Sequence, residues 1–173
     1  PTLAPMLPPL SLSTIALVLA NLVPLAGASF AGWSAYELVL LFWAENVVIG
    51  LFQALRMGSV VLLRRKAHQA GLIPFFVLHY GMFTFVHGMF VTASFGPPAE
   101  APMAEAMALL LSPSGLLFAL LALVASHGFS FVVNFLGAGE WRDADMPALM
   151  KQPYARVVVL HLVIMGGAVA VQA

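Results

Sequence analysis

The sequence predicts an all-α fold, a polytopic membrane helix bundle with about five transmembrane helices. Charged residues make up 8% of the 173 residues and hydrophobic residues 62%, whereas a soluble domain carries about 25% charged residues. The mean hydropathy is +1.00. The apolar residues also fall in runs of about 20, the length that a helix needs to cross the hydrocarbon core. We therefore expect residues 1–173 to form a single transmembrane domain in contact with the lipid bilayer.

Five apolar runs are long enough to be these helices, and they span residues 12–30, 36–63, 72–95, 115–136 and 154–171. The second run is the longest, and Arg56 lies in its last turns, where a long basic side chain can extend toward the membrane surface. The linker at residues 96–114 is rich in proline and could hold a short interfacial helix over residues 103–111. The linker at residues 137–153 carries several charges.

The basic residues fall in two groups that indicate the orientation. One group closes the second helix, and the other lies between the fourth and fifth helices: Arg56, Arg64, Arg65 and Lys66, then Arg142, Lys151 and Arg156. With five spans, both groups lie on one side of the membrane. The positive-inside rule then places the N-terminus in the cytoplasm and the C-terminus outside. The formal net charge is zero, which argues against a nucleic-acid partner, since such a partner needs a basic face.

Ionisable side chains inside the predicted helices indicate a site. Such groups are costly in hydrocarbon and usually face a partner in the bundle interior. Five of them occur on four helices: Glu45 on the second, His79 and His87 on the third, His127 on the fourth and His161 on the fifth. On the fourth helix, His127, Ser130 and Asn134 are spaced to share one face. We expect Asn46 and Asn134 to be second-shell hydrogen-bonding partners of the site.

The depth of each ionisable residue follows from the rise of 1.5 Å per residue in an α-helix. We estimate about 10 Å from the cytoplasmic edge for His79 and His161, and about 15 Å for His127. Glu45 and His87 come out at about 20 Å. The estimate predicts one layer of three histidines and a second layer around Glu45 and His87.

Four sequence strings carry a resemblance to a known family. They are FWAENVVIG at residues 42–50, HYGMFTFVHG at 79–88, SHGFSF at 126–131 with NFL at 134–136, and PYARVV at 153–158 with His161. Together they resemble a family of uncharacterised bacterial integral membrane proteins, a domain of unknown function. The resemblance covers nearly the whole chain. It implies a multi-pass protein of the bacterial cytoplasmic (inner) membrane, and it brings no activity, ligand or cofactor.

A metal site is the function that the sequence favours. His79, His87, His127, His161 and Glu45 are the candidate ligands. Imidazoles from separate helices suit Zn, Fe or Cu, and a carboxylate would balance the charge. The chain has no cysteine, so thiolate ligation is excluded. No HExxH spacing is present, and the sequence does not decide whether the protein is an enzyme.

Three alternatives stay open at this point. His79 and His161 could hold a haem between two helices, or one histidine a chlorophyll, in an accessory subunit of a larger electron-transfer complex. Glu45 and His87 could relay protons or guide a cation in a transporter, which with five spans would need a homo-oligomer. The polar residues could also have a structural role, since they can join neighbouring helices through hydrogen bonds.

Overall fold

The structure is a computed structural model that describes residues 32–113 and 116–172. The helix expected over residues 12–30 lies outside these ranges. The described chain is helical and contains no strand, and four of its helices are long and apolar enough to cross a membrane. The predicted all-α membrane bundle is therefore confirmed for the part of the chain that can be compared.

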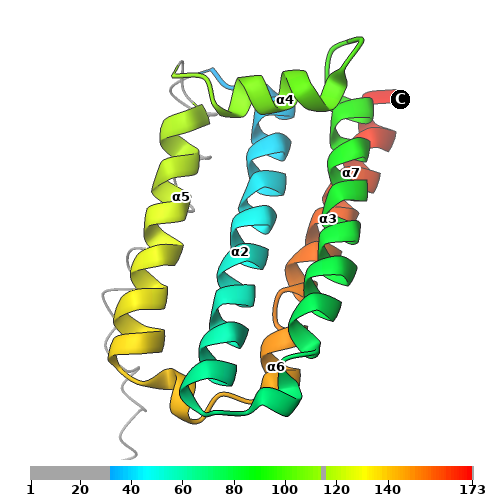
Figure 1. The fold of residues 1–173 in the computed structure, drawn as a ribbon. Coiled ribbons are helices and arrows are strands. Elements are labelled where there is room, and N and C mark those ends of the chain that lie inside the picture. The colour runs from blue at the N-terminus through cyan, green and yellow to red at the C-terminus, as the bar shows by residue number, and fades with distance from the viewer. Residues whose placement is uncertain (1–31, 114–115, 173) are drawn as a thin grey trace, which may run out of the picture.

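The central element is α2, which spans Ala35–Leu63 and lies between α3 and α5 (Figure 1). Helix α3 spans Leu72–Phe95 and α5 spans Leu116–Ser130. A capping box starts α2: Ser34 Oγ accepts from the Glu37 amide at 3.2 Å, and Glu37 Oε2 accepts from the Ser34 amide at 2.7 Å. These bonds satisfy two amides that the first turn would otherwise leave unpaired.

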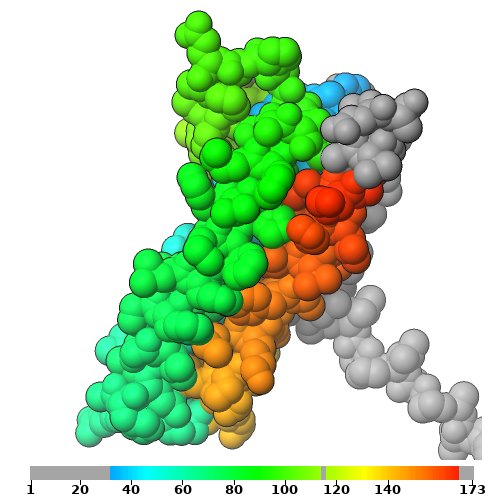
Figure 2. Space-filling model, turned by 90° about the vertical axis from the view of Figure 1, so that its right-hand side faces the viewer, coloured from blue at the N-terminus to red at the C-terminus, as the bar shows by residue number. Residues whose placement is uncertain are grey.

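The other elements surround the ends and one side of α2. Helix α7, Tyr154–Gln172, packs against α3 (Figure 2), whereas α4, Pro102–Leu110, lies across one end of the bundle (Figure 1). Helix α6, Met146–Lys151, lies at the opposite end. The short elements are the 3₁₀ turns Ala67–Gln69 and Glu140–Arg142 and a π-helical stretch, Phe131–Gly137, that extends α5. The described helices begin and end within one residue of the expected bounds.

The turns that carry most residues of the two basic groups lie at the same end of the bundle, as the predicted count of helices requires. The turn between α2 and α3 and the α6 region meet there (Figure 1). Arg64 Nη1 donates to the carbonyl oxygen of Ala144 at 2.6 Å, which ties the two segments together.

The apolar core is divided by a polar band in the middle of α2. One buried cluster includes Trp43 and Ala44, together with Leu160 of α7. A second cluster, toward the basic end, includes Met57 and Val60 of α2 and Val157 of α7. Between them α2 buries three polar side chains, Glu45, Asn46 and Gln53. Because buried polar groups need partners, this band is the part of the fold where a site is expected.

Helices α2 and α3 approach closely at two glycines. The indole Nε1 of Trp43 donates to the Thr84 carbonyl oxygen at 2.7 Å, which fixes the ring against α3. A Cβ atom on Gly88 would lie 2.7 Å from this ring, and one on Gly50 would lie 2.5 Å from the ring of Tyr80. Both positions therefore require glycine for the observed packing.

We expect Gly88→Ala to lower the free energy of unfolding by about 1–3 kcal/mol, the usual cost of overpacking. The Trp43 ring cannot move away without losing its hydrogen bond to α3. Gly81→Ala is the matched control on the same helix, because a Cβ there meets no atom within 4 Å. The measurement is thermal unfolding of each variant in detergent. Equal melting temperatures for the two variants would contradict the close approach.

Candidate functional site

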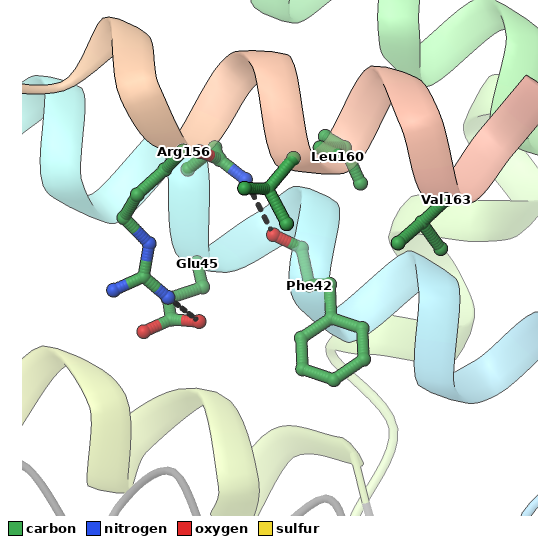
Figure 3. A pocket seen from close by; sticks show the side chains of 7 residues that line it. Phe42, Glu45, Arg156, Leu160 and Val163 are labelled. Carbon is green, nitrogen blue, oxygen red and sulfur yellow. Dashed lines mark hydrogen bonds and ion pairs between the residues drawn. The ribbon is translucent and has the colours of Figure 1, made fainter.

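The centre of the polar band is the carboxylate of Glu45, which is 2% exposed. Arg156 of α7 reaches across to α2, and its Nη2 lies 2.7 Å from Glu45 Oε2 (Figure 3). His127 of α5 approaches the other oxygen, with its Nε2 3.7 Å from Glu45 Oε1. Three helices thus each contribute one ionisable group, and we call Glu45, His127 and Arg156 the charged centre.

One side of the charged centre is incomplete. Glu45 Oε1 and His127 Nε2 are both buried, and neither has a hydrogen-bond partner among the described residues. Their separation of 3.7 Å is too long for a hydrogen bond. A buried polar atom without a partner costs about 1–3 kcal/mol. If His127 Nε2 carried a hydrogen, it could donate to Glu45 Oε1. The two atoms would then have to approach each other by less than about 1 Å to reach hydrogen-bond distance.

Aromatic side chains hold the histidine in place. The Phe52 ring of α2 stacks on the His127 ring with centroids 6.2 Å apart and planes 25° apart. One helical turn farther along α2, the Arg56 guanidinium lies 5.5 Å from the centroid of the Phe135 ring. Phe135 belongs to the π-helical stretch of α5, a feature that occurs frequently at functional sites.

Two cavities meet at the charged centre, and Arg156 lines both. The first, of about 320 Å³, has Glu45 and Asn46 at its polar end and continues along the apolar side chains Phe42, Leu160 and Val163 (Figure 3). The second, of about 190 Å³, lies on the side of His127 toward the basic end of the bundle. The Arg156 side chain is 44% exposed, so part of its guanidinium can face a ligand while one nitrogen pairs with Glu45.

His87 and His161 form a separate pair between α3 and α7. His87 Nδ1 lies 2.7 Å from the Phe83 carbonyl oxygen, so this nitrogen carries a hydrogen and donates it. His87 Nε2 lies 3.1 Å from His161 Nδ1, and in the neutral pair His161 is the donor. The contact already satisfies the two facing nitrogens.

His79 lies apart from the other histidines. Its Nδ1 is 2.7 Å from the Tyr154 hydroxyl, and the ring stacks on Phe75 with centroids 5.3 Å apart. Asn46 donates from its side-chain amide to the Phe42 carbonyl oxygen at 2.9 Å, and its backbone oxygen accepts from the Tyr80 hydroxyl at 3.0 Å.

The predicted two-layer arrangement of these residues is wrong. His127 faces Glu45, and His161 contacts His87. In both contacts a histidine expected in the first layer meets a residue expected in the second. The depth estimate took Tyr154 as the membrane edge. The apolar helical segment instead starts at Met146, which moves every residue of α7 inward. Among the described residues no group of three or more His, Asp or Glu side chains is close enough to hold a metal ion.

Arg156 is the main functional residue that sequence reasoning missed. It was grouped with the basic residues of the last linker because it lies only three residues after Pro153. A signal was present, since a carboxylate inside a membrane helix needs a counter-charge. Asn134 lies in the π-helical stretch and is half-buried.

The fold and the charged centre define a class, a polytopic helical membrane protein with an ion pair and a histidine in its interior. The chain belongs to a family of unknown function, DUF6498, which it matches over residues 4–173. This membership confirms the resemblance to an uncharacterised family. No curated protein and no solved structure matches the chain.

Proposed function

We propose that the chain is a proton-linked transporter in which the charged centre binds and releases a proton. The observation that carries the proposal is the pair of facing, unpartnered atoms Glu45 Oε1 and His127 Nε2, 3.7 Å apart. Ionisable groups at this depth commonly form proton relays in transporters. The two cavities that meet at Arg156 support the proposal, because a solute on either side of the charged centre would sense its protonation.

The proposed chemistry is a transfer of one proton between water and the space between Glu45 and His127. Protonated His127 forms an ion pair with Glu45 Oε1, while Arg156 stays bonded to Oε2. Loss of the proton from Nε2 leaves the neutral ring with its hydrogen on Nδ1 and returns both atoms to the unpartnered state. Arg156 Nη2 pairs with Oε2 at 2.7 Å, so Oε1 stays available to the imidazolium.

The proposal includes an assembly and a location. Four described spans are few for a transporter, so a homo-oligomer or a larger membrane complex would complete the pathway. We infer a bacterial cytoplasmic membrane with the N-terminus in the cytoplasm and the C-terminus outside. The position of both basic groups at one end supports this orientation.

Metal binding is a second candidate with an observation of its own. The atoms Glu45 Oε1 and His127 Nε2 could both reach a Zn, Fe or Cu ion, whose bonds to such ligands are about 2.0–2.2 Å long. Arg156 disfavours this candidate because its positive charge already neutralises Glu45. The haem or chlorophyll candidate is weaker, since His79 and His161 hydrogen-bond to Tyr154 and His87.

We expect Glu45→Gln to slow proton movement through the protein at least tenfold, because the amide cannot pair with an imidazolium by charge. The measurement uses proteoliposomes that contain a pH-sensitive dye, a membrane potential, and a deproteinised extract of bacterial small molecules as the source of solute. Glu100→Gln is the matched control, because it makes the same change at an exposed residue. Equal proton movement in wild type and Glu45→Gln would overturn the proposal.

A further inference from the structure

The cavity of about 190 Å³ beside His127 has the composition of an anion site. We propose that it binds a phosphate-class oxyanion. The inference rests on the proposed function, because it names the solute that the proton accompanies. The cavity is lined by Gln53, Arg56, His127, Ser130, Gln152 and Arg156, together with a few apolar side chains.

Arg56 is the residue that points most directly to a ligand. Its Nε is buried and has no hydrogen-bond partner among the described residues. Its Nη2 makes only a long contact of 3.5 Å with Ser130 Oγ. A guanidinium carries five N–H donors in a planar fork that matches the oxygens of a phosphate. Arg56 therefore has N–H donors that the described residues leave unused. An oxyanion could accept hydrogen bonds from these donors.

Other polar groups complete the wall of the same space. The exposed part of Arg156 faces this cavity as well as the first one. The amide nitrogen of Gln53 donates to the Leu149 carbonyl oxygen, and it also lies 3.5 Å from Gln152 Oε1. These contacts orient the two amides at the wall of the cavity. Charged and polar side chains from α2, α5 and the start of α7 thus surround one small volume.

The charge of the cavity also favours an anion. Two guanidinium groups line it, and Glu45 neutralises the one on Arg156. Glu140 interacts electrostatically with Arg56 but lies in an exposed turn, where solvent screens it. A positive charge remains when His127 is neutral, and protonation of His127 adds another. Binding of the proton and binding of the anion would therefore strengthen each other.

The position of the cavity offers two sources for the phosphate group. Gln152 and Pro153 place it beside the turn between α6 and α7, at the end of the bundle that carries the basic loops. A free phosphate could enter from the water at this end. A phospholipid could place its headgroup here and its acyl chain along Val159, Leu160 and Val163, which line the adjoining cavity.

The test is isothermal titration of the purified full chain in detergent, with inorganic phosphate in one arm and short-chain phosphatidate in the other. We expect Arg56→Gln to weaken binding about tenfold or more, because a hydrogen bond to a charged group is lost. Arg65→Gln is the matched control, an identical change at an exposed residue of the turn between α2 and α3. Arg56→Lys keeps the charge without the fork and should bind with intermediate affinity.

The outcomes separate the ligand source from the proposal itself. Arg56-dependent binding of inorganic phosphate supports the site with a free anion, and tighter Arg56-dependent binding of phosphatidate supports it with a lipid headgroup. Absence of binding in both arms, or equal affinities in wild type and a folded Arg56→Gln or Arg56→Lys, would overturn the site. Protonation of His127 is measured in a separate experiment. If the protein binds a proton but no phosphate, the anion site is wrong and the proposed proton binding stands.

Discussion

Arg156→Met is expected to lower the free energy of unfolding by about 1–3 kcal/mol, since the buried carboxylate of Glu45 loses its hydrogen-bond donor. Glu45 is 2% exposed and pairs with Arg156 at 2.7 Å. The double variant Glu45→Met/Arg156→Met should recover most of this loss, because no unpaired carboxylate then remains in the interior. Thermal unfolding of the single and double variants in detergent measures both effects.

The same pair of variants separates a structural role from a functional one. A purely structural ion pair predicts that the double variant is stable and still transports. The charged centre as proposed predicts a stable protein without proton movement, because His127 has lost the carboxylate that it faces. If Arg156→Met is as stable as wild type, the ion pair drawn in Figure 3 does not form in the protein.

The helices could be predicted because their signal is local. A run of apolar residues of sufficient length forms a membrane helix whatever its neighbours are. The capping residue Ser34 and the proline at the start of α4 mark their helix starts directly in the sequence. The number of predicted helices also implied that the two basic groups lie at the same end of the bundle. The contact between Arg64 and Ala144 confirms this prediction.

The partners within the site could not be predicted in the same way, because they depend on relative heights of the helices. Helix α6 belongs to the apolar segment that begins at Met146, so Tyr154 lies inside it and not at its edge. An error of two helical turns, about 11 Å, is enough to exchange one histidine partner for another.

The π-helical stretch is a second reason. The sequence spacing of His127, Ser130 and Asn134 assumed a regular α-helix, whereas the helix widens after Ser130. A π turn uses i→i+5 hydrogen bonds, so it rotates the residues that follow relative to the expected face. This change places Phe135 against Arg56, and no periodicity in the sequence indicates it.

The proton-binding step is most directly tested by nitrogen magnetic resonance of ¹⁵N-histidine protein in bilayers. The chain has five histidines, and the His127 signal is assigned by its loss in His127→Gln. We expect the pH response of the His127 ring signal to depend on Glu45, because Glu45 Oε1 faces His127 Nε2 at 3.7 Å. The pH response should therefore differ between wild type and Glu45→Gln, while Glu100→Gln should behave as wild type. A His127 signal that responds to pH identically in wild type and Glu45→Gln would contradict proton binding by this pair.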